Sequence, residues 1–178
     1  MPRLQAIKLE QAGGLARELL DGAKKKMGRV PNLLKHLANS PAALKAYLEF
    51  SGALKDGAFP DELRECIALA VAEQNRCDYC RAAHTALGKM AGLSPEEMLD
   101  CRRGESADPR RQAAIRLARR ILETRGAVSD DDLAAARKAG FDDAGIVEIV
   151  AVTVLNLYTN FINHVADTQL DFPAAPAL

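Results

Sequence analysis

The sequence of 178 residues contains no tryptophan, and aromatic residues make up only 4% of it. Since 48% of the residues are hydrophobic, the core has to be built mainly from alanine, leucine, isoleucine and valine, which suits closely packed helices. Net charge is absent as well, because 24 lysines and arginines balance 24 aspartates and glutamates. A chain without a basic field lacks the main attraction to nucleic acid and to anionic membranes, so we expect neither partner.

Long apolar runs are also missing. The segment 1–10 lacks the continuous apolar stretch of a signal peptide, and no window approaches the ~18 apolar residues of a membrane span. We therefore expect a cytoplasmic protein. In a reducing compartment its four cysteines do not form a structural disulfide framework, which leaves catalysis, metal binding or simple burial for each of them.

The apolar/polar alternation that is typical of strands is absent too, whereas helical periodicity runs through the chain. We predict an all-α, single-domain helical bundle over residues 1–178, with segments 1–12 and 174–178 loosely ordered. Capping and breaking residues set the ends of the expected helices. These helices are 14–27, 31–38, 41–54, 61–76, 78–91, 95–103, 109–125, 130–138 and 144–167.

Beside these absences stands one compact motif, Cys77-Asp78-Tyr79-Cys80, with Glu65 twelve residues before Cys77 and His84 four residues after Cys80. Cysteines three apart on a helix share a face, so their sulfurs come close enough to form a disulfide or to share a metal ion. We expect Asp78 to cap the new helix, which puts both cysteines near a helix N-terminus, where a thiolate is favoured. His84 lies on the stripe of Cys80 and supplies a base for thiol chemistry.

The predicted helix 61–76 is apolar on most of its faces, and Glu65 lies on it. A carboxylate in such a helix is costly unless it is paired or solvated in a pocket, which makes Glu65 a candidate functional residue. Glu73, two turns later on a similar face, is its main rival. We expect Cys66 to be buried and inert, and Cys101 to be a partly exposed bystander.

A Cys-x-x-Cys pair by itself is shared by redox sites, zinc sites and chance burial of small apolar side chains. A structural zinc site needs four ligands, and here it would have to recruit His84 and a distant His164 or Glu65. A thioredoxin-like site needs a βαβ context, which this chain lacks. His164, near the end of the last expected helix, either approaches the site or satisfies the helix terminus.

Glu65, Cys77-Asp78-Tyr79-Cys80 and the following segment to His84 together resemble the active-site pattern of the alkylhydroperoxidase D-like branch of the carboxymuconolactone decarboxylase family. Similar segments at 28–32 and 163–173 extend the resemblance over most of residues 28 to 173. The resemblance implies an all-helical fold, a homo-oligomer such as a trimer or hexamer, and thiol-dependent reduction of peroxides.

Carried over residue by residue, the resemblance makes Cys80 the peroxidatic thiol and Cys77 the resolving thiol, with His84 and Glu65 as the proton relay. A thiolate of this kind attacks a peroxide and becomes a sulfenic acid, which the second thiol converts to a disulfide. We expect no bound metal or cofactor, and an external dithiol such as a lipoyl or thioredoxin-like protein as reductant.

The sequence departs from the family pattern at Tyr79, where some members carry a histidine. Its phenol either donates a hydrogen bond to a thiolate or peroxide oxygen, or packs against the bundle, so Tyr79 is an auxiliary candidate together with His164. The decarboxylase branch of the family lacks the cysteine pair, so its presence in this sequence favours a redox function over lactone decarboxylation. A metal-dependent or decarboxylase-type enzyme, and a redox-sensing oligomer without efficient turnover, stay open as alternatives.

Overall fold

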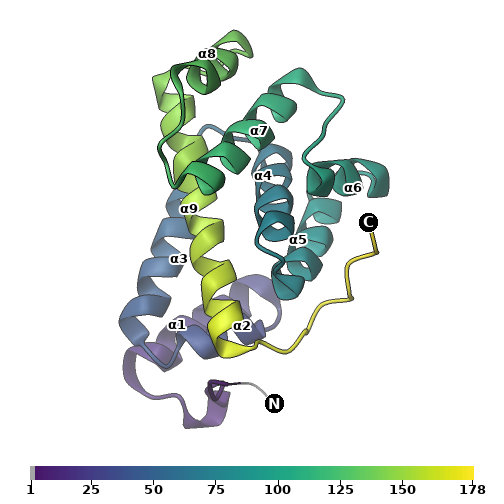
Figure 1. Ribbon diagram of the computed structural model, residues 1–178. Helices are drawn as coiled ribbons and strands as arrows, with labels where there is room; N and C mark the ends of the chain where they lie inside the picture. Colours follow the sequence, from purple (N-terminus) through teal and green to yellow (C-terminus); the bar gives the residue numbers. More distant parts are fainter. Residues whose placement is uncertain (1–2) are drawn as a thin grey trace.

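The computed structural model describes residues 3–178, and every regular element in this part of the chain is helical (Figure 1). The predicted all-α bundle is therefore confirmed. A short 3-10 helix, Leu9–Gln11, precedes the α-helices. These are α1 Gly14–Met27, α2 Asn32–Leu37, α3 Pro41–Lys55, α4 Asp61–Gln74, α5 Asp78–Met90, α6 Pro95–Arg103, α7 Pro109–Thr124, α8 Asp130–Lys138 and α9 Asp143–Ala166.

Side-chain caps start several helices where the sequence offers serine or aspartate. Ser94 accepts a hydrogen bond from the Glu97 backbone N–H, and the Glu97 carboxylate accepts one from the Ser94 N–H, which completes a capping box at α6. Ser129 and Asp132 form the same arrangement at α8. Because these caps are local, the predicted helix ranges agree with the structure to within two residues, and only the 3-10 helix was not predicted.

Helix α4 runs through the middle of the bundle and contacts α5, α6, α7 and α9 (Figure 1). Its side chains Ile67, Leu69 and Val71 are completely buried. Full burial of such a side chain stabilises the fold by about 1.5–3 kcal/mol. The core is thus built from aliphatic side chains around α4, and any residue on α4 is held in a rigid setting.

Helix α9 is long and apolar enough to cross a membrane by length and composition alone, with a mean hydropathy of 1.6. The expectation that no stretch approaches a membrane span is wrong for this helix. Helical packing explains its composition, because α9 contacts α2, α3, α4, α5 and α7. Its buried positions also include polar side chains, namely Thr153, Asn156, Thr159, Asn160 and Asn163.

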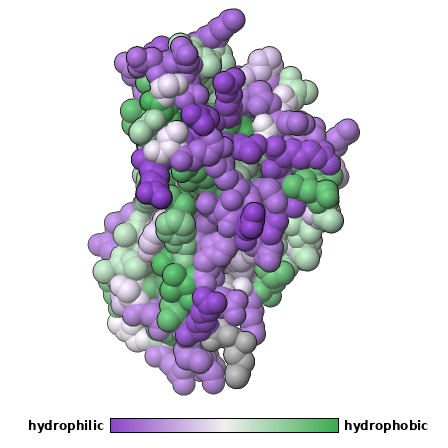
Figure 2. Space-filling model, viewed as in Figure 1, coloured by the Kyte–Doolittle hydropathy of each residue, from purple (hydrophilic) through white to green (hydrophobic). Residues whose placement is uncertain are grey.

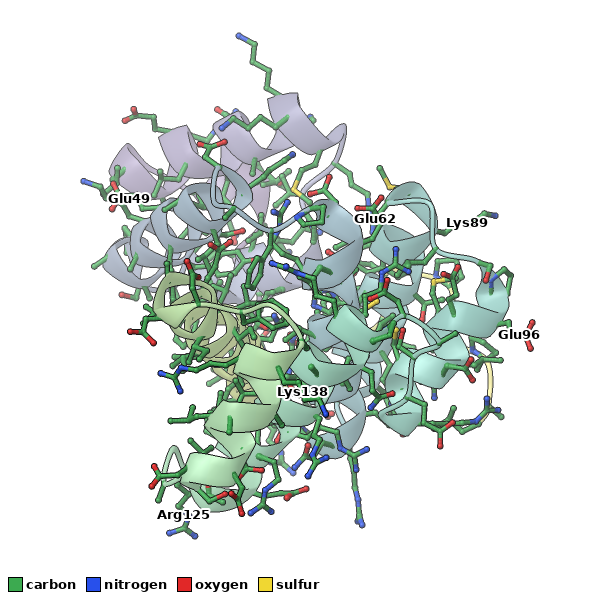
Figure 3. All side chains as sticks on the ribbon, turned by 90° about the horizontal axis from the view of Figure 1, so that it is seen from above. Glu49, Glu62, Lys89, Glu96, Arg125 and Lys138 are labelled. Atoms are coloured by element: carbon green, nitrogen blue, oxygen red, sulfur yellow. The ribbon has the colours of Figure 1, made fainter. Side chains whose placement is uncertain are left out.

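The outer side of α9 exposes a row of apolar side chains, which we call the α9 apolar stripe: Val147, Val150, Val154, Phe161 and Val165. Figure 2 shows apolar side chains along α9 between polar regions. Charged side chains lie at the periphery elsewhere, as Glu49, Glu96 and Arg125 do in Figure 3. The stripe therefore gathers five exposed apolar side chains on a single helix.

The segments next to both ends of the chain make hydrogen bonds to helices. The Arg3 N–H donates to the Ala166 carbonyl over 2.9 Å, and the Ile7 N–H donates to the Lys35 carbonyl over 3.1 Å. Near the other end, Arg102 of α6 donates to the Pro176 carbonyl. Loose order of these segments stays a prediction, and for residues 1–2 it lies outside the described part of the chain.

Candidate active site

The turn between α4 and α5 places the cysteine motif. Arg76 adopts the left-handed region with φ of +54°, which reverses the chain after α4. Cys77 then has extended backbone and is the N-cap of α5, because its Sγ accepts a hydrogen bond from the Cys80 N–H over 3.4 Å. The prediction that Asp78 caps this helix is wrong. Asp78 is the first helical residue, and its carboxylate pairs with Arg81.

The two thiols of the motif lie side by side under the surface. Cys77 and Cys80 are each 2% exposed, and their side chains are hydrogen-bonded to one another. That hydrogen bond lowers the pKa of Cys77, and the Cys80 backbone N–H and His84 act in the same direction. The same hydrogen bond, together with burial, raises the pKa of Cys80. Of the two thiols, Cys77 therefore loses its proton more readily than Cys80.

Glu65 of α4 and His84 of α5 form an ion pair beside the thiols. The Glu65 Oε2 lies 2.8 Å from the His84 Nδ1, and both side chains are 17% exposed. Burial alone would lower the pKa of His84, but the charge and hydrogen bond of Glu65 outweigh it and raise the pKa above its ordinary value. The carboxylate thus holds the proton on Nδ1 and leaves Nε2 to exchange protons with other groups.

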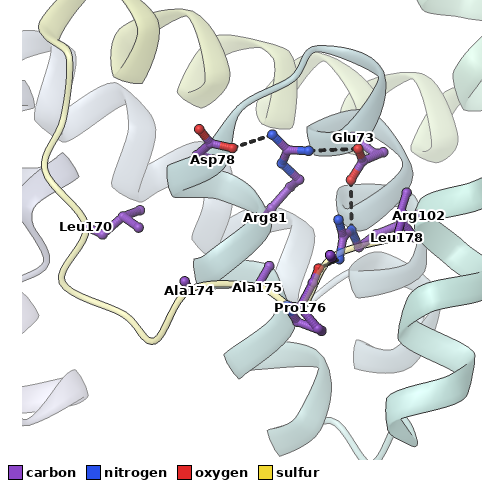
Figure 4. Close-up of a pocket in the computed structure, with 10 residues that line it drawn as sticks. Glu73, Asp78, Arg81, Arg102, Leu170, Ala174, Ala175, Pro176 and Leu178 are labelled. Carbon is purple, nitrogen blue, oxygen red and sulfur yellow. Dashed lines mark hydrogen bonds and ion pairs between the residues drawn. The ribbon is translucent and has the colours of Figure 1, made fainter.

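Glu73, the rival carboxylate, is occupied elsewhere. Its two oxygens lie 2.8 Å from Arg81 Nη1 and 2.8 Å from Arg102 Nε. These groups line a cavity of about 400 Å³ between α5, α6 and the C-terminal segment (Figure 4). Neither Cys77 nor Cys80 lines this cavity. The structure therefore brings Glu65, and not Glu73, to the histidine.

Tyr79 contributes an anchoring contact. Its hydroxyl accepts a hydrogen bond from the Leu33 N–H of α2 over 3.3 Å, and its ring packs edge-on against Phe172 at 5.8 Å. Burial raises the pKa of its phenol. Tyr79 thus ties α5 to α2 and to the C-terminal segment, which is the packing alternative of the two that the sequence left open.

His164 is exposed, and its Nε2 lies 3.0 Å from the Asn75 carbonyl oxygen at the end of α4. The structure therefore places it at the α4–α5 turn and gives it no contact with either thiol. Within residues 3–178, no group of three or more His, Cys, Asp and Glu side chains is arranged to hold a metal ion.

Three polar side chains near Cys80 were not singled out from the sequence. The Asn163 Nδ2 donates to the Cys80 Sγ over 3.2 Å, and Asn160 lies on the same side of α9. Tyr47 of α3 packs against the cluster that contains both thiols. Burial, followed by the charges of Cys80 and Glu65, raises the pKa of Tyr47 to about 12. The sequence feature that could have pointed to Asn160 and Asn163 is their spacing of three residues on an otherwise apolar helix.

A second pair of thiols lies in the core, away from the motif. Cys66 of α4 and Cys101 of α6 are hydrogen-bonded to one another and are at most 1% exposed. Cys66 is buried as expected, whereas the prediction that Cys101 is partly exposed is wrong. The reason is that α6 packs against α4 and turns Cys101 inward, among Leu69, Met98 and Ile115.

Comparisons with known proteins agree with the fold. Residues 41–124, which run from α3 to α7, match the model of the carboxymuconolactone decarboxylase family. The structure is similar to the alkylhydroperoxidase AhpD core of an uncharacterized peroxidase-related protein from Ralstonia eutropha JMP134, with 25% identity, a TM-score of 0.86, and coverage of 96% of this chain and 92% of that chain. An uncharacterized peroxidase-related protein from Silicibacter sp. TM1040 has 26% identity, a TM-score of 0.79, and coverage of 92% and 90%.

The same fold occurs in a protein with different chemistry. The debrominase Bmp8 has a TM-score of 0.77 with 16% identity, and the alignment covers 93% of this chain and 90% of that one. At this identity the likeness concerns the fold alone. No curated protein matches the chain.

Proposed function

We propose that this chain, which matches the model of the carboxymuconolactone decarboxylase family over residues 41–124 and is similar in structure to the alkylhydroperoxidase AhpD core, is a thiol-dependent peroxidase of the AhpD-like type. The observation that supports this proposal best is the position of the dithiol. Cys77 and Cys80 are hydrogen-bonded to one another at a helix N-terminus, beside a histidine whose protonated form is stabilised by Glu65.

In the first step Cys80 attacks the peroxide. Its proton passes to the Cys77 thiolate along the hydrogen bond that joins the two sulfurs. The Cys80 thiolate then attacks the terminal oxygen of the hydroperoxide, so that an S–O bond forms and the O–O bond breaks. Sulfur is oxidised to a sulfenic acid, and the departing alkoxide takes the proton of the His84 imidazolium to become an alcohol.

In the second step Cys77 resolves the sulfenic acid. Neutral His84 accepts the Cys77 proton, and the resulting thiolate attacks the Cys80 sulfur. A disulfide forms while hydroxide departs and takes the same proton back from His84 as water. One hydroperoxide has then become one alcohol and one water, and two thiols have become a disulfide.

The disulfide has to be reduced before the next turnover. We propose an external dithiol, such as a lipoyl or thioredoxin-like protein, because a dithiol closes its own disulfide and returns two electrons and two protons. Of these protons, one restores the Cys80 thiol and one restores the His84 imidazolium. No bound cofactor enters this sequence of steps.

We also propose that the protein is a homo-oligomer. The α9 apolar stripe supports this, since Val147 is 67% exposed and Val165 is 59% exposed in the single chain. Contiguous exposed apolar surface of this kind favours a contact with another protein surface. A second copy of the chain is the occupant that the resemblance implies.

The test is steady-state reduction of a hydroperoxide by the purified protein with dihydrolipoamide and, separately, with reduced thioredoxin. We expect turnover by the wild type and its loss in Cys80→Ser, whereas Cys77→Ser reacts once and stops at the sulfenic acid. Cys101→Ala, which changes a buried thiol outside the motif, is the matched control and keeps its turnover. Unchanged turnover in Cys80→Ser would refute the proposal. Rapid disulfide formation without steady-state turnover with any dithiol would favour a redox sensor instead.

A further inference from the structure

Two asparagine side chains of α9 lie against the Cys80 thiol. Asn160 is completely buried and Asn163 is 4% exposed, and their spacing of three residues puts them on one side of the helix. The Asn163 Nδ2 donates to the Cys80 Sγ over 3.2 Å. Asn160 lies on the same side of α9, and the hydrogen bond from Asn163 opposes the rise in the pKa of Cys80.

Each of these amides has one buried polar atom without a protein partner. The Asn160 Oδ1 accepts a hydrogen bond from the Asn75 Nδ2 over 2.9 Å, which orients the amide and leaves the Asn160 Nδ2 unpaired. The Asn163 Nδ2 is used by Cys80, which leaves the Asn163 Oδ1 unpaired. A buried polar atom without a partner costs about 1–3 kcal/mol, so a small ligand with one donor and one acceptor would satisfy both atoms beside the sulfur.

We propose that Asn160 and Asn163 form the binding site for the terminal –O–O–H group of the hydroperoxide, next to the Cys80 sulfur. The inference rests on the proposed peroxidase function and adds a substrate site to it. The hydroxyl hydrogen of the peroxide donates to the Asn163 Oδ1, and the inner oxygen accepts from the Asn160 Nδ2. One free acceptor and one free donor thus match one donor and one acceptor of the ligand.

The same contacts serve the chemical step. When the S–O bond forms and the O–O bond breaks, the terminal oxygen stays on sulfur with its hydrogen still on the Asn163 Oδ1. The negative charge moves to the inner oxygen, where the Asn160 Nδ2 donates to it before His84 delivers a proton. The Asn163 Nδ2 stabilises the Cys80 thiolate before the attack. Donors aimed at the position where charge develops need no rearrangement during the reaction.

This site recognises the part that all hydroperoxides share. None of its contacts involves the organic group, so the site selects the class of hydroperoxides and not one carbon skeleton. A polar site that binds a hydroxyl discriminates against compounds that lack it, because its own buried groups are then left unpaired. Hydrogen peroxide, tert-butyl hydroperoxide and cumene hydroperoxide should therefore depend on the two asparagines to the same degree.

The experiment measures the rate of peroxide-driven disulfide formation in the reduced protein at several peroxide concentrations. We expect the second-order rate constant to fall about tenfold to a hundredfold in Asn160→Ala and in Asn163→Ala, by the same factor for all three peroxides. Asn163→Asp keeps the size and the Oδ1 atom but loses the donor, so it should be slow as well. Asn156→Ala is the matched control, because the Asn156 Nδ2 donates to the Val152 carbonyl, and its rate should stay within about twofold of wild type.

A second measurement separates this inference from the proposed function. Alkylation of Cys80 is followed by mass spectrometry against pH, with no peroxide present. Both Asn163 variants should raise the pH at which Cys80 becomes reactive, and Asn156→Ala should not. If the wild type turns over peroxide but the Asn160 and Asn163 variants keep their rates and pH profiles, the site is refuted and the peroxidase survives. Losses that differ between the three peroxides would also refute it.

Discussion

Glu65 and His84 come from consecutive helices and meet through a 2.8 Å contact between Oε2 and Nδ1. The contact joins α4, the central helix, to the helix that carries both reactive thiols. Since α4 is packed on most sides, the carboxylate is held in place and the imidazole has one defined orientation. In the proposed reaction, a proton donor for the departing alkoxide is therefore in position before a peroxide arrives.

Replacing Glu65 by Gln should lower the pKa of His84. Burial, which disfavours the imidazolium, would then act without the opposing carboxylate. The proposed reaction needs protonated His84, so the alkaline limb of the pH profile of kcat/KM should move to lower pH by about one unit or more. The profile is measured with one hydroperoxide in excess dithiol, and an alkaline limb that stays in place would exclude Glu65 from the relay.

The same ion pair should make stability depend on pH. The pKa of His84 is raised in the folded protein, so protonation of His84 favours folding. This contribution is fully present below the unfolded value of about 6.5 and is lost as the pH rises through the folded value. The difference in free energy of unfolding between wild type and Glu65→Gln should therefore be larger at pH 6 than at pH 9. Urea unfolding at the two pH values measures it, and equal differences would contradict the prediction.

Replacing Tyr79 by Phe should affect stability and leave the chemistry intact. The Leu33 N–H loses its hydroxyl acceptor, which should cost about 1 kcal/mol, while the ring keeps its contact with Phe172. Urea unfolding measures the loss, and the pH profile of Cys80 alkylation is the companion measurement. A shifted alkylation profile would show that the phenol acts on the thiols after all.

Replacing Glu73 by Gln should destabilise the fold without changing the relay. Arg102 is buried and would lose its only carboxylate partner within residues 3–178, which should cost about 3 kcal/mol. Arg81 keeps Asp78, so it loses less. Thermal unfolding checks the stability, and turnover per folded molecule should stay at the wild-type level. A changed pH profile of turnover would instead indicate that Glu73 takes part in the proton relay.

Replacing Phe161 by Asp should weaken self-association, because a carboxylate would have to be desolvated within the proposed contact along the α9 apolar stripe. Light scattering coupled to size-exclusion chromatography measures the mass. Met90→Asp is the matched control, since Met90 is 83% exposed at the end of α5, outside the stripe. If both variants keep the wild-type mass, or both lose it, the stripe is not the contact.

Local interactions account for what could be predicted from the sequence. Capping residues such as Ser94 and Ser129 act within a few residues, so the helix ranges followed from spacing alone. Helical periodicity also placed Glu65 and His84 on the faces of α4 and α5 where they meet in the structure. The identity of the N-cap could not be predicted. Arg76 adopts the left-handed region, which makes Cys77 the N-cap of α5 in place of Asp78, and arginine is not a residue type that favours this conformation.

Contacts between distant helices account for what could not be predicted. Cys101 is buried because α6 packs on α4, and Asn163 reaches Cys80 across 83 positions of sequence. The hydropathy of α9 also misleads, because a helix surrounded by others in a bundle resembles a membrane span in composition. Only the packed structure shows that its asparagines face a thiol.

The core pair Cys66 and Cys101 has a practical consequence for measuring the stability of this protein. Without tryptophan, the chain lacks the usual fluorescent reporter of unfolding. Both core thiols are at most 1% exposed, so an alkylating reagent reaches them only when α4 and α6 separate. Pulsed labelling of Cys66 and Cys101 in the unmodified protein therefore measures the free energy of opening its central helix, at one defined place and under native conditions.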